Sequence, residues 1–306
     1  MRRFLGRFGI VVAVAVVILL LLPQEKASPT GAWLAARGLT AKTVRVGTSD
    51  LRYVRKGAGP TIILIHGIAS SIYSWADVIG PLSEHFDVIA VDLPGYGEST
   101  QPADLTFDAF EPALVGFMDA LAVPRAHFAG NSLGGAISLM MAVRRPDRVD
   151  RLVLVDSAAF NMRLNERPFM IRVMGAEAAG MISDRLPIRR TLTRATLSRL
   201  LHDRSRVTDE RVNEYVAPLL RPGALVATRS LLHSPIDDRI VAALGRIEAK
   251  TLVIWGRYDP WLPESHADRF VAAIRGARKV VVEAGHMPQE ERPEEVAMLI
   301  RDFLIS

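Results

Sequence analysis

The stretch that decides the fold reads Ala126-His127-Phe128-Ala129-Gly130-Asn131-Ser132-Leu133-Gly134-Gly135-Ala136. A short apolar run enters it, and an apolar helical pattern continues from it to residue 143. Gly130, Ser132 and Gly134 have the G-x-S-x-G spacing of a sharp strand-to-helix turn that exposes a serine hydroxyl. Glycine suits both flanks because the strand and the helix nearly touch there. Chance produces this spacing in roughly one 300-residue chain in ten, so the interpretation depends on the surrounding sequence.

Length and composition are those of a globular enzyme. The chain has 306 residues, of which 49% are hydrophobic and 23% charged, enough for one large domain with an insertion. The 38 basic and 33 acidic residues leave a net charge of +5, and no basic strip is interleaved with aromatic residues, so nucleic-acid binding is not indicated. There is no cysteine, which excludes disulfides, cysteine nucleophiles and iron–sulfur clusters.

The first 23 residues predict a membrane anchor. Several arginines precede an uncharged run at residues 8–22, which Pro23 closes. A secretory signal is the alternative, but it needs small residues at a cleavage site, and none follow here. The run approaches the span of about 20 residues that an anchor requires if Arg7 lies at the headgroups. The positive-inside rule then places the catalytic body on the outer (periplasmic or extracellular) face, after a linker at 24–42.

From residue 43 onward, short apolar runs alternate with helical patterns. After a hairpin at 43–55 the runs are continuously apolar, which favours parallel strands buried on both faces. We expect strands at 61–65, 87–91, 127–129, 151–155, 251–255 and 279–282, and helices at 73–85, 107–120, 133–144, 264–274 and 294–304. This alternation predicts an α/β doubly wound fold whose core comprises residues 43–157 and 233–306.

The alternation breaks at residues 158–232, which are helical in character. Eleven arginines and no lysine, against six acidic residues, lie between Arg163 and Arg211. We interpret 158–232 as a helical cap inserted after the strand that ends at Val155. The arginines fit a solvated face, and contact with anionic lipid headgroups is the alternative.

Polar residues follow most of the predicted strands, at the edge where an open parallel sheet gathers its functional groups. They are His66, Asp92, Ser132, Asp156, Asp259 and His286. A serine becomes nucleophilic when a base accepts its proton, and the base must be held in one tautomer. Ser132, Asp259 and His286 meet that need, in the chain order expected for this fold.

Three of these residues have other interpretations. His66 precedes a glycine beside the predicted oxyanion loop and is interpreted as structural. Asp156 competes with Asp259 as the orienting acid, but it could instead cap the segment that follows it. Asp92 precedes a Leu-Pro-Gly turn and is interpreted as a turn or packing carboxylate.

Two backbone N–H groups are expected to stabilise the oxyanion that forms on the substrate. Leu133 begins a helix directly after the serine, and Ile68 follows the strand at 61–65. The sequence contains no metal-ligand cluster, nucleotide loop or flavin fingerprint, so we predict neither a metal nor a cofactor.

Four motifs together resemble the α/β-hydrolase superfamily over residues 43–306. They are His66-Gly67-Ile68, Asp92-Leu93-Pro94-Gly95-Tyr96-Gly97-Glu98-Ser99, Gly130-Asn131-Ser132-Leu133-Gly134-Gly135, and the pair Trp255-Gly256-Arg257-Tyr258-Asp259 with Gly285-His286-Met287-Pro288. The resemblance implies that Ser132, Asp259 and His286 form a catalytic triad and that 158–232 is a lid over the acyl pocket.

The resemblance specifies the fold more closely than it specifies the substrate. Epoxide hydrolases and haloalkane dehalogenases carry an aspartate where Ser132 stands. Carbon–carbon hydrolases of aromatic catabolism often share the Gly-Asn-Ser elbow, but they tend to place a tryptophan where Met287 follows the histidine. We expect a membrane-anchored serine esterase or lipase-like hydrolase that forms an acyl-enzyme from a small-molecule or lipid ester. A meta-cleavage carbon–carbon hydrolase and a cofactor-free haloperoxidase-like hydrolase are the alternatives.

Overall fold

The central element is an eight-stranded sheet with the order β1-β2-β4-β3-β5-β6-β7-β8. The computed structural model describes residues 30–102, 104–160, 189–221, 224–234 and 236–306. The strands are β1 (Ala41–Val46), β2 (Ser49–Lys56), β3 (Thr61–Ile65), β4 (Asp87–Val91), β5 (Ala126–Asn131), β6 (Val149–Val155), β7 (Lys250–Gly256) and β8 (Arg278–Val282). The pairs β1–β2 and β2–β4 are antiparallel, and the other pairs are parallel. The predicted mostly parallel α/β sheet is confirmed.

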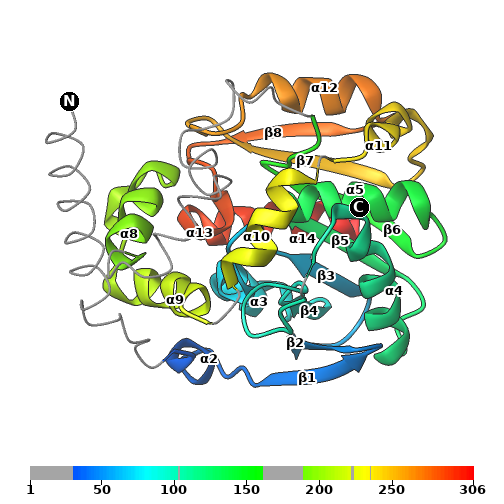
Figure 1. The fold of residues 1–306 in the computed structure, drawn as a ribbon. Coiled ribbons are helices and arrows are strands. Elements are labelled where there is room, and N and C mark those ends of the chain that lie inside the picture. The colour runs from blue at the N-terminus through cyan, green and yellow to red at the C-terminus, as the bar shows by residue number, and fades with distance from the viewer. Residues whose placement is uncertain (1–29, 103, 161–188, 222–223, 235) are drawn as a thin grey trace, which may run out of the picture.

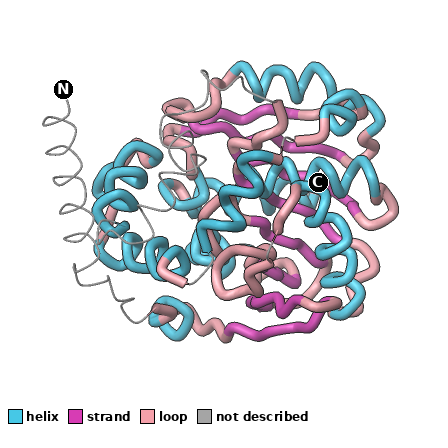
Figure 2. The backbone as a smooth tube through the Cα atoms, in the orientation of Figure 1, coloured by secondary structure: helices cyan, strands magenta, loops and turns pink. Residues whose placement is uncertain are grey.

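Helices cover both faces of the sheet (Figures 1 and 2). The described helices are α2 (Ala32–Ala36), α3 (Ala76–Leu82), α4 (Phe110–Ala120), α5 (Leu133–Arg144), α8 (Arg189–Leu200), α9 (Asp209–Leu219), α10 (Ala224–His233), α11 (Asp238–Ala242), α12 (Ser265–Ala273), α13 (Pro288–Glu291) and α14 (Pro293–Ile305). One apolar cluster packs α4, α5 and α12 on one face, and a second packs α3 and α14 on the other. Neighbouring residues such as Ile63 and Leu64 belong to different clusters, which explains why the strands are continuously apolar.

Among the described residues between β6 and β7, all regular secondary structure is helical. Figure 1 shows α8 and α9 lying together to one side of the sheet, with α10 leading back toward the core. The cap predicted at 158–232 includes residues outside the described ranges, and its bounds stay a prediction. The segment expected as a linker is partly folded, since α2 buries Trp33 against Tyr73 with ring centroids 5.4 Å apart. The backbone N–H of Gly31 donates to Glu214 Oε1 of α9 at 2.8 Å.

The predicted membrane-anchored localisation is corrected by the structure. Among the residues described, no helix combines the length and the apolar composition needed to cross a membrane. Helix α14, the longest of them, has 13 residues, whereas a span needs about 20. The segment 1–23, on which the anchor was predicted, lies outside the described residues.

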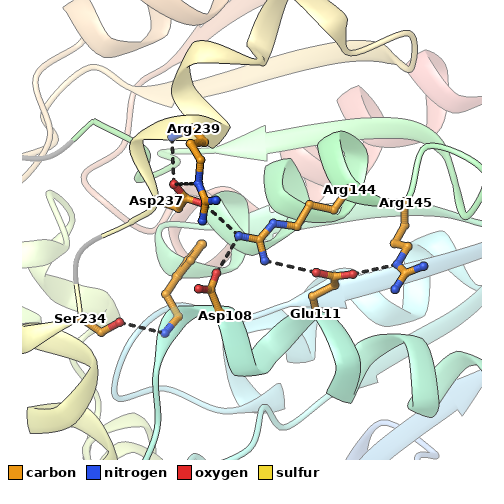
Figure 3. A network of polar contacts seen from close by, with 8 residues as sticks. Asp108, Glu111, Arg144, Arg145, Ser234, Asp237 and Arg239 are labelled. Carbon is orange, nitrogen blue, oxygen red and sulfur yellow. Dashed lines mark hydrogen bonds and ion pairs between the residues drawn. The ribbon is translucent and has the colours of Figure 1, made fainter.

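A network of ion pairs joins Arg144 and Arg145, at the C-terminal end of α5, to carboxylates near the starts of α4 and α11 (Figure 3). The Arg144 guanidinium donates to Asp108 at 2.7 Å, Glu111 at 3.2 Å and Asp237 at 3.0 Å. Arg145 donates to the other Glu111 oxygen at 2.7 Å. The side chains of Glu111 and Asp237 are only 15% and 16% exposed, and Arg144 contacts both of them, while Arg145 and Arg239 each contact one.

We expect Arg144→Ala to lower the free energy of unfolding by about 2 kcal/mol, because two half-buried carboxylates lose a charged donor. Arg145→Ala is the matched control. Its side chain is 48% exposed and contacts one carboxylate, so the expected loss is below about 1 kcal/mol. Urea denaturation of both variants measures the difference, and equal losses would contradict the central place given to Arg144.

Candidate active site

The predicted serine stands on a strained turn between β5 and α5. Ser132 has φ 54° and ψ −115°, a left-handed φ that non-glycine residues rarely adopt. A Cβ at Gly130 would lie 2.2 Å from the Gly134 carbonyl oxygen, and one at Gly134 would lie 2.2 Å from the Ile65 carbonyl oxygen. The close approach of β5, α5 and β3 therefore explains both glycines. Strain of this kind is concentrated at functional sites, where the surrounding structure holds it in place.

The predicted base and acid are in direct contact. His286 Nδ1 donates to Asp259 Oδ2 at 2.7 Å, and the two side chains are 3% and 1% exposed. The second Asp259 oxygen accepts from the N–H groups of Trp261 at 2.7 Å and Leu262 at 3.0 Å. His286 Nε2 is buried and has no hydrogen-bond partner among the described residues. The imidazole thus has one nitrogen held by an acid and the other free to accept a proton.

The hydrogen bond from His286 Nδ1 is favoured when the Asp259 carboxylate is negatively charged. Burial raises the pKa of the Asp259 carboxyl, but the charge and hydrogen bond of His286 and the two backbone donors outweigh it. The net pKa lies below its usual value, so Asp259 is ionised at neutral pH and accepts from Nδ1.

Hydrogen bonds connect the turn at Ser132 to the loop that carries His286. The Asn131 side chain, one residue before Ser132, donates to the His286 carbonyl at 3.1 Å and to the Val155 carbonyl at 3.2 Å. The Ala158 N–H donates to the Ser132 carbonyl at 3.0 Å. The three predicted residues therefore come from loops at the same end of the sheet, as the strand-end rule requires.

The predicted oxyanion loop lies against the serine. A Cβ at Gly67 would come within 3.3 Å of Ser132 Cβ, so the backbone that leads into Ile68 borders the elbow. Ala69 has φ 53°, a second strained residue in this loop. Leu133 is the first residue of α5, where a backbone N–H has no acceptor within the helix. The donor roles of Ile68 and Leu133 stay predictions.

His66 and Asp92 have structural partners. His66 Nδ1 donates to the Gly67 carbonyl at 2.7 Å, while its Nε2 accepts from the Leu93 N–H at 3.1 Å. Burial lowers the pKa of His66 to about 4, so the ring is neutral with both nitrogens engaged. Asp92 accepts from the N–H groups of Ile72 at 2.7 Å and Glu98 at 2.9 Å.

Contacts that the sequence did not predict join the end of α8 and the residues after it to the loop that carries His286. The His286 N–H donates to the Leu200 carbonyl at the end of α8, at 2.8 Å. Buried Glu291 accepts from the N–H groups of Gly285 at 2.6 Å and Asp203 at 2.7 Å. The described part of the cap therefore helps to place the predicted base.

A buried ion pair adds a second connection to this loop. Arg211 Nε of α9 lies 2.9 Å from Glu290 Oε2, and Tyr215 donates to the other Glu290 oxygen. The Tyr215 hydroxyl is also 3.5 Å from Met287 Sδ. Burial raises the pKa of Glu290 to about 7, and the charge of Arg211 opposes the rise.

This pKa predicts a pH-dependent stability. A carboxyl whose folded pKa lies above its unfolded value near 4.5 binds more protons in the folded state. The contribution of Glu290 to stability should therefore fall as the pH rises from about 4.5 to about 7, by up to roughly 3 kcal/mol. The lowered pKa of His66 contributes with the opposite sign, so the test compares slopes: Glu290→Gln should lose the fall that Glu290 contributes, while exposed Glu294→Gln should keep the wild-type slope. Urea denaturation at about pH 5 and about pH 8 measures the slope, and a Glu290→Gln slope equal to wild type would refute the assignment.

One group of described side chains has the residue types of a metal site. Ligand-type atoms of Asp156, Asp259 and His286 lie within 4.8 Å of one another. However, Nδ1 of His286 is 2.7 Å from Asp259 Oδ2, the length of a direct hydrogen bond. We therefore interpret the group as acid and base in contact, not as a metal centre.

Comparisons with known proteins agree with the fold. A sequence profile described as alpha/beta hydrolase fold matches residues 60–293. The 2-hydroxymuconate semialdehyde hydrolase of Pseudomonas sp. (strain CF600) is 31% identical over 280 residues, 88% of this chain and 93% of that protein. The crystal structure of a mutant meta-cleavage product hydrolase has a TM-score of 0.73 and 29% identity, over 86% of this chain and 97% of that one. The structure of a membrane phospholipase A, described as a bacterial virulence factor, has a TM-score of 0.72 and 26% identity, over 99% and 98%.

Proposed function

Because the chain belongs to the alpha/beta hydrolase family, we propose that it is a serine hydrolase with Ser132 as its nucleophile, His286 as its base and Asp259 as the orienting acid. The observation that carries the proposal is the His286 Nδ1 to Asp259 Oδ2 hydrogen bond of 2.7 Å, beside a buried Nε2 that has no hydrogen-bond partner in the described part of the chain. This arrangement selects the tautomer whose Nε2 can accept a proton from a hydroxyl.

In this mechanism Ser132 Oγ attacks a carbonyl carbon while His286 Nε2 takes the hydroxyl proton. The N–H groups of Leu133 and Ile68 stabilise the charge that forms on the carbonyl oxygen. His286 then gives its proton to the leaving group, and an acyl-enzyme remains on Ser132. Water, deprotonated by His286, attacks the acyl carbon and releases the acid, which restores the free serine.

For the substrate we propose a carboxylic ester with a hydrophobic acyl group. The residue after the base, Met287, is buried in an apolar cluster with Leu197, Leu200, Leu201 and Val212 of the cap. The tryptophan that tends to follow the histidine in carbon–carbon hydrolases is absent from this position. The likeness to a membrane phospholipase A over 99% of the chain supports the same substrate class.

Carbon–carbon hydrolysis of a meta-cleavage product is the second candidate. The 31% identical curated relative and the meta-cleavage product hydrolase structure support it better than they support the ester. Both reactions need the same serine, base and acid. They differ in the leaving group, which is an alcohol in one and a carbanion that must be protonated in the other.

Two assays on the purified protein separate these candidates. The first measures turnover of p-nitrophenyl esters from acetate to palmitate, and the second follows loss of absorbance of a ring-fission dienoate. We expect ester turnover in the first assay, and fluorophosphonate labelling of wild type but not of Ser132→Ala. Cleavage of the dienoate without ester turnover would establish the second candidate. Failure of both assays together with absent labelling would refute a serine hydrolase.

A further inference from the structure

A second carboxyl lies behind the predicted orienting acid. Asp156 follows β6, is fully buried, and has φ 40°, a left-handed conformation that an aspartate adopts at a cost. Its N–H donates to the Ile254 carbonyl at 3.0 Å. Its two carboxyl oxygens lie 2.9 and 3.2 Å from a single donor, the Gly256 N–H. One N–H shared between two oxygens leaves a buried carboxylate poorly compensated.

A carboxyl oxygen of Asp156 lies within 4.8 Å of a carboxyl oxygen of Asp259. Two buried carboxylates this close repel each other, so one of the two groups keeps a proton. Asp259 receives three N–H donors, from His286, Trp261 and Leu262, all of which favour its charged form. Within the described ranges Asp156 receives one N–H donor, and it also faces the negative charge of Glu291. The proton therefore belongs on Asp156.

The direction of the pKa shifts agrees with this assignment. Burial, followed by the charge of Asp259, raises the pKa of Asp156 well above its usual value. The pKa of Asp259 moves the other way, below its usual value, because His286 and the backbone donors outweigh its own burial.

We propose that Asp156 is a positioning residue that stays protonated at neutral pH and donates its O–H to Asp259, holding that carboxylate against His286 Nδ1. The inference rests on the proposed function, because Asp156 acts on the reaction only through Asp259. A neutral donor supports the orienting carboxylate without adding a second negative charge beside the imidazole. At metal sites, groups that orient a ligand from behind contribute about 10- to 100-fold to affinity or activity, and we expect a similar contribution from Asp156.

Two substitutions at one position test the proposal. Asparagine imitates a protonated aspartate, since its amide donates to Asp259 and its carbonyl accepts from the Gly256 N–H. Asp156→Asn should therefore leave kcat/KM within about threefold of wild type, with the acid limb of the pH profile in place. Asp156→Ala removes the donor and should lower kcat by about 10- to 100-fold with little change in KM. Asp92→Ala, which removes an equally buried carboxyl outside this group, serves as the control for loss of stability.

A readout that needs no substrate completes the test. In a carboxyl ¹³C NMR spectrum at neutral pH, wild type should show a protonated aspartate signal that is absent from Asp156→Asn. The proposal is overturned if that signal is missing, if asparagine lowers kcat as much as alanine, or if asparagine moves the acid limb. An Asp156→Ala variant with wild-type kcat would also overturn it. Loss of all turnover and labelling in wild type would instead refute the proposed function, while the NMR signal would still test the proton on Asp156.

Discussion

Replacing His286 with alanine should lower kcat by roughly 10⁴- to 10⁶-fold while the protein stays folded. The expected loss is large because Nε2 is the acceptor for the serine proton, and no other described imidazole is in contact with Asp259. Asp259→Asn should lower kcat by about 10⁴-fold, because an amide can hold the His286 ring in the wrong tautomer. The Ser132→Ala/His286→Ala double variant should be no worse than either single variant, since the residues act as a unit.

A histidine on the strand that leads into the serine turn provides the control. His127 is also buried, but it stands at the start of β5 and its Nδ1 is 3.3 Å from Asp150. His127→Ala should change kcat by less than about tenfold, because this ring is far from the elbow at the other end of the strand. Steady-state kinetics on the best ester, with circular dichroism to confirm folding, compare the variants. A loss below tenfold in His286→Ala would remove His286 from the mechanism.

Gly130→Ala should reduce the free energy of unfolding by about 4 kcal/mol or more. Its Cβ would lie 2.2 Å from the Gly134 oxygen, 2.3 Å from the Gly134 carbon and 2.5 Å from the Gly135 nitrogen. All three are backbone atoms, so the clash is relieved only if α5 moves away from β5. That movement would also shift Ser132 and the Leu133 N–H, so any folded variant should have lost most of its activity.

Gly80 is the matched control for this substitution. It lies within α3, and a Cβ there would meet no atom within 4 Å. Gly80→Ala should therefore change the free energy of unfolding by less than about 1 kcal/mol, because the helix preference of alanine is opposed by its restriction before Pro81. Thermal and urea denaturation of both variants measure the contrast. A Gly130→Ala protein as stable as Gly80→Ala would mean that strand and helix are not in contact at the elbow.

Much of the fold was readable from local sequence. Continuously apolar runs such as Thr61–Ile65 predicted strands buried on both faces, and they form the parallel part of the sheet. Some boundaries were missed where a short turn precedes the helix. The helix expected at 73–85 is a 3-10 turn at Ile72–Trp75 followed by α3. The predicted linker contains α2, because the burial of Trp33 depends on a partner far along the chain.

The candidate site was likewise predicted only in part from the sequence. The glycine spacing around Ser132 and the order of Ser132, Asp259 and His286 are local or sequential patterns, so the sequence alone predicted which residues to test. The choice between Asp259 and Asp156 as the acid in contact with His286 depended on which carboxyl reaches Nδ1, and only the tertiary structure decided it. The same holds for Leu200 and Glu291, which hold the histidine loop. The physical reason is that periodicity and turn chemistry act between neighbouring residues, whereas these hydrogen bonds join loops that only the packed sheet brings together.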